Sequence, residues 1–489
     1  MGQVKSRRSG LTKSTPNDDP ACIINILIDD VLFKIFSLLT ISEKLTASRT
    51  CKRWHSLIKD PHVWQTVDFW NGYNLDSPYQ SEQDEAKYIK QLTNTTMRIL
   101  QSYTDSSLRV VYLRASNRAV MRYLTKKCPN LQTLSFLSPD QHTPYSCNKD
   151  IIKYFPKIDF ALPLQLEKLQ LSFVANRNCT YDDDYPTREL RMVSIRQFRD
   201  TVIPRILQCQ NLRHLTLYKC NEISPEDVEI LTSGLPKLQE LCLLYFTTSS
   251  FATRDHAQPA VLEEILRIIV DNLPDLTSLH IITAKYYMLN ELTYVAGAYS
   301  IDNILQELCN RHKFTDLHVT EALFNPVSFA TMTQALPNMT ELGLYDCNCV
   351  TDEIMKIIAR DLSNLEILLL NDSGPYTDIG LKALQYHPSL QSLTIFKERR
   401  QPRHSDRQIL STEVIFETLM SLPKLKEAKL LKWGCRVTHD IIFQRYLNEL
   451  RAIKPHVRIC TQQYRYHGPV SCGNSLHGED MRKQTFFPY

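Results

Sequence analysis

Residues 211–235 read NLRHLTLYKCNEISPEDVEILTSGL, and this stretch decides the fold. Leu215 and Leu217 are two residues apart, so they point to one face of a short strand while the residue between them points to the other. The sequence SPED at 224–227 then starts a helix, because it supplies an N-cap serine, a proline at the first helical position and acids in the first turn. The stretch therefore predicts one strand followed by one helix.

The same pattern recurs along the chain, and its shorter intervals are about 25 residues, the period of a leucine-rich repeat. Longer intervals predict units that carry loop insertions. A single unit cannot bury its own leucines, so the units must stack into an α/β solenoid, with parallel strands on the concave face and helices on the other side. Similar helix starts at Thr351 and Thr377 support this horseshoe. The units begin at Leu108, Leu131, Leu166, Leu212, Leu238, Leu276, Phe314, Met339, Leu365, Leu390 and Leu425.

Composition narrows the class of protein. A chain of 489 residues exceeds what a single hydrophobic core supports, so it is multi-domain or a repeat array. The hydrophobic share of 43% and the charged share of 22% are those of folded globular chains, and the sequence predicts no membrane-spanning segment. A formal net charge of +4 is too small to predict nucleic acid as a partner. Only 12 glycines argue against glycine-rich phosphate-binding loops.

The 14 cysteines are spread over the whole chain, and residues 1–20 are polar and basic, unlike a secretory signal. We therefore expect reduced thiols and a cytoplasmic protein. Cys460, His467, Cys472 and His477 are of ligand type, but they lack the close pair of a zinc module, so we predict no metal. Local catalytic motifs are missing from the sequence, and we predict neither catalytic residues nor a cofactor.

Changes in composition divide the chain into five segments. The second segment contains short apolar bursts at helical spacing, which predict a compact module of three helices. We expect a disordered basic tail over residues 1–22, the helical module over 23–70, a connector over 71–105, about eleven to twelve repeats over 106–460, and a C-terminal tail over 461–489.

Two sets of motifs resemble one known family. In the repeats, LYKC at 217–220 and LYDC at 344–347, each followed by a helix start, resemble the cysteine-containing subtype of leucine-rich repeat. In the helical module, ILIDDVLFKIFSLL at 26–39, CKRW at 51–54 and DPHVW at 60–64 resemble an F-box. With both parts in this order, the chain resembles the F-box/leucine-rich-repeat proteins.

The resemblance implies that the F-box docks on the Skp adaptor of a cullin-based ubiquitin ligase. Ile28 stands where the family usually has proline. Trp54 is the expected main anchor, because aromatic side chains dominate such interfaces. The alternative interpretation is that the same residues form the core of the module, but so small a module cannot bury all of them. The residues implied to bind the adaptor are Leu27, Val31, Ile35, Phe36, Leu38, Leu39, Cys51 and Trp54.

The resemblance further implies a non-catalytic substrate receptor. The F-box would hold the Skp adaptor and, through it, the cullin scaffold, while the repeat face would hold an unidentified protein substrate for ubiquitination and proteasomal degradation. Two alternatives stay open. One is a membrane-tethered leucine-rich-repeat adaptor or scaffold without a ligase role, and the other is a receptor for a small ligand on the concave face.

The first residues, MGQVKS, fit the pattern for N-myristoylation of Gly2, with a serine at the required offset. Lys5, Arg7, Arg8 and Lys13 supply the second, basic signal that stable membrane anchoring needs. The sequence therefore predicts lipidation and membrane association. The alternatives are a disordered basic tail and a weak nuclear-localisation cluster, which would place the protein in the nucleus.

Overall fold

The computed structural model describes residue 24 and residues 27–70, 82–114, 116–137, 161–172, 198–218, 220, 223–246, 258–283, 302–320, 322, 324–345, 347, 349–371, 374–396, 410–431 and 441–460. The chain divides into two compact units: unit 1 contains residues 1–143 and 160–166, and unit 2 contains residues 144–159 and 167–489. Gly2 and both predicted tails lie outside the described residues.

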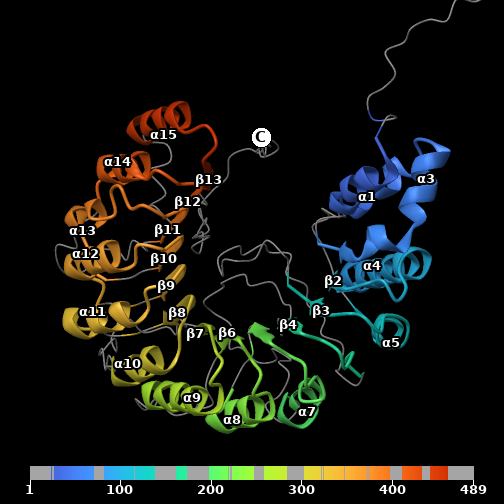
Figure 1. The fold of residues 1–489 in the computed structure, drawn as a ribbon, viewed down its shortest axis with the longest axis horizontal. Coiled ribbons are helices and arrows are strands. Elements are labelled where there is room, and N and C mark those ends of the chain that lie inside the picture. The colour runs from blue at the N-terminus through green and yellow to red at the C-terminus, as the bar shows by residue number, and fades with distance from the viewer. Residues whose placement is uncertain are drawn as a thin grey trace, which may run out of the picture. The chain divides into compact units, whose positions relative to one another are not determined.

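Unit 1 begins with three short helices and continues into the first strand–helix repeats (Figure 1). Its three described strands are parallel, with β1 paired to β2 and β2 paired to β3. The elements are α1 (Asp29–Leu38), α2 (Ile41–Ala47), α3 (Lys52–Lys59), the 3₁₀ turn η2 (Pro61–Trp64), β1 (Thr66–Asp68), α4 (Glu82–Tyr103), β2 (Val110–Tyr112), α5 (Arg118–Lys127) and β3 (Thr133–Ser135).

The last part of the helical module shares its core with the first repeats of unit 1. Trp64 is fully buried, and its ring stacks on that of Tyr103 with centroids 4.5 Å apart. Backbone groups continue this contact, because the carbonyl of Gln65 accepts hydrogen bonds from Arg109 and Val110. The segment expected as a connector thus contains a long helix, α4, that packs against the module.

Unit 2 repeats one strand and one helix in chain order, and its strands β4 to β13 are all parallel to their neighbours. The strands are β4 (Lys168–Ser172), β5 (His214–Tyr218), β6 (Glu240–Phe246), β7 (Ser278–Thr283), β8 (Asp316–Thr320), β9 (Glu341–Tyr345), β10 (Ile367–Asn371), β11 (Ser392–Phe396), β12 (Glu427–Leu431) and β13 (Arg458–Cys460). The helical segments are a π-helical turn η3 (Phe198–Val202), α7 (Ile203–Ile206), α8 (Pro225–Gly234), α9 (Gln258–Asn272), α10 (Asp302–Arg311), α11 (Pro326–Ala335), α12 (Asp352–Asp361), α13 (Asp378–Lys382), α14 (Thr412–Ser421) and α15 (Ile441–Ile453).

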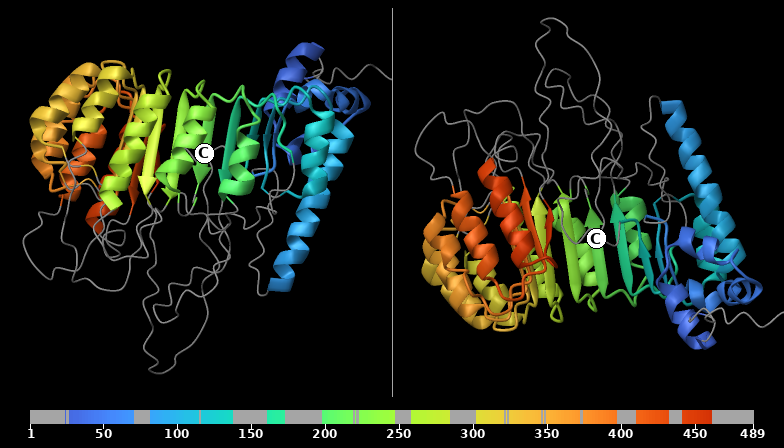
Figure 2. Two further views of the ribbon diagram at one scale, coloured as in Figure 1. Left: turned by 90° about the horizontal axis from the view of Figure 1, so that it is seen from below. Right: turned by 90° about the horizontal axis from the view of Figure 1, so that it is seen from above.

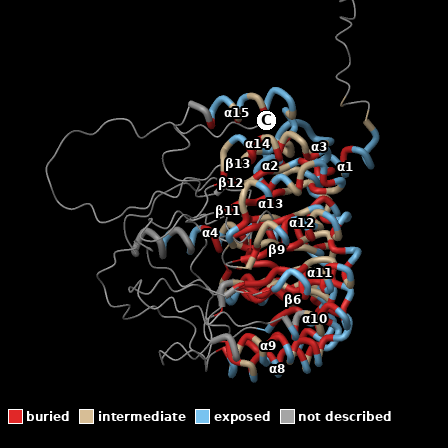
Figure 3. Tube along the Cα trace, turned by 90° about the vertical axis from the view of Figure 1, so that its left-hand side faces the viewer, coloured by how far each residue is buried: buried red, intermediate tan, exposed pale blue. Residues whose placement is uncertain are grey.

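Within unit 2 the strands line the inner, concave side and the helices cover the outer side (Figures 1 and 2). The repeated leucines form continuous ladders between these layers. Leu215 pairs in register with Leu241, and the same column continues through Leu279, Leu317 and Leu342, all of them buried. Figure 3 shows this buried layer as a continuous band. The predicted α/β repeat solenoid is therefore confirmed.

The three helix starts predicted in unit 2 form where the sequence places them. At α8 the Ser224 hydroxyl accepts a hydrogen bond from the backbone N–H of Asp227, whose carboxylate accepts one from the N–H of Ser224. At α13 the Thr377 hydroxyl accepts one from the N–H of Ile379. Helix α12 begins after Thr351 with two acids in its first turn, but the Thr351 side chain makes no cap hydrogen bond.

None of the helices in the described ranges is long and apolar enough to cross a membrane.

Candidate protein-docking surfaces

Helix α1 carries apolar side chains on two opposite faces. The acidic residues Asp29 and Asp30 favour the helix start, because they lie in its first turn. Leu32 and Phe36, four residues apart, face inward and are buried. A second set of apolar residues follows the same helical spacing on the outward face and is exposed to solvent. These residues form an apolar stripe that the rest of the module does not cover. The exposed fractions are 65% for Ile28, 38% for Val31, 36% for Ile35 and 86% for Leu38.

Helix α3 lies against α1 and brings Trp54 onto Phe36. The Cys51 thiol caps the helix by accepting a hydrogen bond from the N–H of Trp54 at 3.5 Å. The half-buried Trp54 ring meets the Phe36 ring edge-on, with centroids 5.2 Å apart and an interplanar angle of 64°. Phe36 therefore supports Trp54 from the core side.

An ion pair fixes the start of α1 on α3. The guanidinium of Arg53 donates hydrogen bonds to Asp29 Oδ1, from Nε at 3.0 Å and from Nη2 at 2.6 Å. The Nη2 group also donates to the carbonyl of Leu27 at 2.6 Å. These contacts hold the first turn of α1 in place, so the apolar stripe has a defined orientation relative to Trp54.

The structure separates the eight residues that the resemblance implied to bind an adaptor. Phe36 is 1% exposed and belongs to the core of the module, because it lies on the inward side of α1 with Leu32. Val31, Ile35 and Leu38 lie on the exposed stripe. Leu27, Leu39 and Trp54 are half-buried at its margin, and Cys51 is exposed.

The concave side of unit 2 is a second candidate surface. The residues between the buried leucines align in columns, because every strand pair is in register. One column runs from Lys168 through His214 and Glu240 to Ser278, and continues with Asp316 and Glu341. A second column, two residues further along each strand, is formed by Gln170, Thr216, Cys242, His280, His318 and Gly343.

Comparison with known proteins agrees with both parts of this architecture. A family model described as F-box-like matches residues 29–70. Mouse F-box/LRR-repeat protein 12 is 23% identical over 361 residues, which cover 70% of this chain and 94% of the mouse protein. The chain combines an F-box-like domain with leucine-rich repeats.

Other similarities cover shorter parts of the relatives. Human F-box/LRR-repeat protein 12 is 31% identical over 124 residues, 22% of this chain and 31% of the human protein. F-box protein SKIP1 of Arabidopsis thaliana is 27% identical over 126 residues, 25% of this chain and 41% of that protein. The match thus spans less than half of the Arabidopsis relative.

Two solved structures share parts of the repeat architecture at low similarity. One is described as Rad7 and Elc1 in complex from yeast, with a TM-score of 0.34 and 13% identity over 72% of this chain and 83% of that chain. The other is the leucine-rich-repeat protein LegL7 from Legionella pneumophila, with a TM-score of 0.31 and 11% identity over 71% of this chain and 91% of that chain. At these TM-scores no functional likeness follows.

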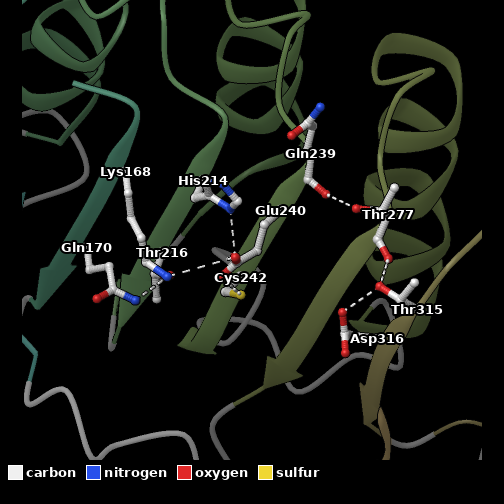
Figure 4. Close-up of polar contacts among 10 residues, drawn as sticks. All are labelled: Lys168, Gln170, His214, Thr216, Gln239, Glu240, Cys242, Thr277, Thr315 and Asp316. Atoms are coloured by element: carbon white, nitrogen blue, oxygen red, sulfur yellow. Dashed lines mark hydrogen bonds and ion pairs between the residues drawn. The ribbon is translucent and has the colours of Figure 1, made fainter. Parts of the chain in front are cut away.

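A polar network crosses the repeat strands β4 to β6 on the concave side (Figure 4). Glu240 Oε2 lies 2.8 Å from His214 Nδ1 and 3.9 Å from Lys168 Nζ. Burial acts to raise the pKa of Glu240, but the hydrogen bond from His214 and the charge of Lys168 outweigh it and lower the pKa to about 2. Glu240 is therefore a permanent anion held by two neighbouring repeats.

Threonines tie the next repeats together at the beginning of each strand (Figure 4). The Thr277 hydroxyl donates to the carbonyl of Gln239 at 3.2 Å, and the Thr315 hydroxyl lies 3.3 Å from the carbonyl of Thr277. The Thr315 hydroxyl also lies 2.7 Å from Asp316 Oδ2, and the Thr340 hydroxyl lies 3.3 Å from Asp316 Oδ1. These contacts orient the Asp316 carboxylate on the repeat surface.

The described residues contain no group of three or more His, Cys, Asp or Glu side chains that could hold a metal ion. Of the four C-terminal ligand-type residues considered in the sequence, only Cys460 is described, at the end of β13. His467, Cys472 and His477 lie outside the described residues.

Sequence reasoning missed two residues that shape the F-box-like domain. Arg53 was visible only as part of the CKRW motif, and its pairing with Asp29 joins residues that are far apart in the chain. Lys44 is 2% exposed, and its Nζ donates to the carbonyl of Val63 at 3.0 Å and lies 5.1 Å from the centre of the Trp64 ring. Burial lowers the pKa of Lys44 to about 8. The sequence hinted at the burial of Lys44 in one way: it lies three residues after the apolar Ile41, so both side chains fall on the same face of α2.

Proposed function

We propose that this protein is a non-catalytic substrate receptor of an SCF-type ubiquitin ligase. The F-box-like domain binds the Skp adaptor and thereby the cullin scaffold, and the repeats bind a protein target that is ubiquitinated and degraded. One observation carries this proposal: Val31, Ile35 and Leu38 of the exposed apolar stripe lie within the residues 29–70 that match the F-box-like model.

Physical reasons favour a protein partner for the stripe. Exposed apolar residues aligned on one helix face bury apolar area when another protein covers them, and each buried side chain contributes about 1.5–3 kcal/mol. Leu38 is the most exposed of these residues, and the half-buried Trp54 is the aromatic side chain proposed as a second anchor.

The proposed mechanism is proximity. A receptor that holds the adaptor on one surface and the target on another converts a collision between separate molecules into an event within one complex, which raises the effective concentration of the target lysine near the ubiquitin carrier. This mechanism needs no catalytic residue on the receptor. The proposed target-binding surface is the concave side of unit 2, where the column from Lys168 to Glu341 presents partly exposed charged side chains, while the second column lies mostly buried beneath it.

The adaptor-binding part is tested with a Leu38→Glu variant of the full chain. Leu38 is 86% exposed, so the charge leaves the fold intact but places a carboxylate in the centre of the proposed interface. We expect the affinity for purified Skp adaptor to fall by about tenfold or more, measured by calorimetric titration. The matched control is Val327→Glu, a residue of unit 2 that is 77% exposed and lies outside the F-box-like domain.

Equal adaptor affinity of wild type and Leu38→Glu would overturn the proposal. So would a loss of affinity of the same size in Val327→Glu. Circular dichroism of both variants shows whether the fold is kept.

The cellular location is a separate proposal that rests on the sequence alone. We propose a cytoplasmic protein that is tethered to membranes through a myristoyl group on Gly2 and the adjacent basic residues. Mass spectrometry of the N-terminal peptide and cell fractionation of a Gly2→Ala variant test it. Relocation without any change in target turnover would favour the alternative of a membrane-tethered scaffold without a ligase role.

A further inference from the structure

Two histidines lie side by side at the centre of the concave face of unit 2. His280 on β7 and His318 on β8 are paired in register, so their side chains leave the sheet on the same face. Their rings are stacked, with centroids 3.8 Å apart and an interplanar angle of 4°. His318 is 1% exposed, and His280 Nε2 is shielded from solvent with no hydrogen-bond partner among the described residues.

The neighbouring strand is built around this pair. The residue in register with His318 on β9 is Gly343. A Cβ atom at this position would lie 2.7 Å from Cγ and 2.8 Å from Nδ1 of His318, closer than side chains tolerate. The ring of His318 therefore occupies the space that any other residue at 343 would fill, and the stack is a packed feature of the face.

Polar groups of β9 lie close to both ring nitrogens of His318. Its Nδ1 lies 3.2 Å from the Tyr345 hydroxyl. Its Nε2 lies 2.9 Å from Glu341 Oε1, but it is buried and makes no hydrogen bond within the described residues. Burial raises the pKa of Tyr345 well above its usual value, so this hydroxyl keeps its proton.

Charged and titratable groups surround the pair on every packed strand. Glu240 and Cys242 lie on β6, Asp316 on β8, and Glu341 and Tyr345 on β9. Burial lowers the pKa of both histidines to about 3, and for His280 the three carboxylates only partly offset burial. A proton on either ring would place a positive charge in a site shielded from water and directly against the other imidazole.

We propose that the His280–His318 pair is a proton-operated lock on the concave face: the neutral stack holds the surface from β6 to β9 in one shape, and uptake of a proton by either ring opens it. This device goes beyond the proposed receptor function, and it does not depend on adaptor binding. Its consequence for the receptor is that target binding through this face weakens on acidification.

The test measures local opening by hydrogen exchange in the full-length protein. Amide exchange of residues 278–283 and 316–320 is followed by mass spectrometry at pH 7.5 and pH 5.5 and corrected for the intrinsic exchange rates. In an open state with ordinary histidine pKa values near 6.5, each histidine increases opening by about tenfold between these pH values. In wild type we therefore expect the amides of residues 278–283 and 316–320 to be less protected at pH 5.5 than at pH 7.5 by this factor. The amides of residues 392–396 in β11 should lose less protection.

The decisive variant is His280→Phe, which keeps an aromatic ring in the stack but removes one titrating group. We expect it to lose about tenfold less protection than wild type over the same pH change. The control is His456→Gln, which removes an exposed histidine of the same unit and should behave as wild type.

Two results would overturn the proposal: equal protection of wild type at both pH values, or an unchanged pH response in His280→Phe. If that variant fails to fold, the exchange of the imidazole C2 hydrogens in wild type gives the answer directly. Transitions of His280 and His318 well below pH 6 support the lock, and transitions near 6.5 contradict it. Leu38→Glu, which tests the adaptor site, leaves this measurement unaffected.

Discussion

At the scale of single residues, Lys44 contributes an unfavourable free energy to the F-box-like domain. Its ammonium group is buried against Val63 and Trp64, and burial lowers its pKa from 10.5 to about 8. Between these two values the unfolded chain binds a proton that the folded chain does not. Stability therefore rises with pH from about 8 to about 10.5, and at neutral pH the charged form costs up to about 3 kcal/mol.

A Lys44→Met variant tests this interpretation. Methionine fills the same space without a charge but leaves the Val63 carbonyl without its donor, so we expect a net gain of about 1 kcal/mol in the free energy of unfolding at pH 7. Thermal unfolding is followed by the fluorescence of Trp54, Trp64 and Trp70, which all lie in unit 1. The rise in stability above pH 8 should disappear in this variant and persist in the control Lys34→Met. A destabilised Lys44→Met would show that the hydrogen bond and the contact with Trp64 outweigh the cost of burial.

The backbone at Ile28 explains why the usual proline is dispensable there. Ile28 has φ of −68°, which is the angle that proline enforces, so the conformation exists without the ring. Arg53 also fixes this helix start through its hydrogen bonds to Asp29 and to the carbonyl of Leu27.

At the scale of elements, the strands were predictable from the sequence because their signal is local. Leucines at fixed offsets such as 212, 215 and 217 specify a buried ladder whatever the neighbouring unit contains. Periodicity alone did not separate the faces of α1, since both Phe36 and Leu38 are apolar and only packing against α3 shows which is core. At Thr351 the sequence likewise places the start of α12 but does not reveal that the adjacent Asp352 carboxylate contacts the next repeat.

Asp352 is the element-scale feature that sequence reasoning missed. Its Oδ1 accepts hydrogen bonds from the backbone N–H of Thr377 at 2.6 Å and of Gly380 at 2.8 Å, and its Oδ2 accepts one from the Thr377 hydroxyl at 2.8 Å. A Cβ at position 380 would lie 2.4 Å from Oδ1, so the glycine permits this close approach. One repeat thus caps the helix of the following repeat.

We expect Asp352→Ala to destabilise the α12–α13 region by about 2–3 kcal/mol, because it leaves buried N–H groups without an acceptor and removes a charged hydrogen-bond partner. The matched control is Glu353→Ala, whose exposed side chain pairs with Lys356 at 3.3 Å and should change stability by less than about 0.5 kcal/mol. Amide exchange of residues 378–396 measures the effect. Similar exchange in the two variants would mean that the cap between repeats does not stabilise α13.

At the scale of the whole molecule, unit 1 holds the F-box-like domain, α4 and the first repeats in one compact unit. The sequence predicts the helical module and the connector as successive segments but not the contacts that join them. They include the stack of Trp64 on Tyr103, supported by the Ser107 hydroxyl donating to the carbonyl of Pro61 at 2.9 Å. Such contacts join residues about 40 positions apart, and helical periodicity contains no information about them.

This organisation predicts that the F-box-like domain depends on α4 for its stability. Replacing Tyr103 with alanine removes the ring under Trp64 and leaves a cavity, which should lower the stability of unit 1 by about 2 kcal/mol. Since unit 1 is one compact unit, we expect it to unfold cooperatively, so amide protection should fall together in α1, α3 and α4, measured by hydrogen exchange with mass spectrometry. Arg98→Ala, an exposed change on the same helix, is the control. If Tyr103→Ala loosens α4 but leaves α1 and α3 protected, the F-box-like domain folds on its own core of Leu32, Phe36 and Trp64, and α4 is only attached to it.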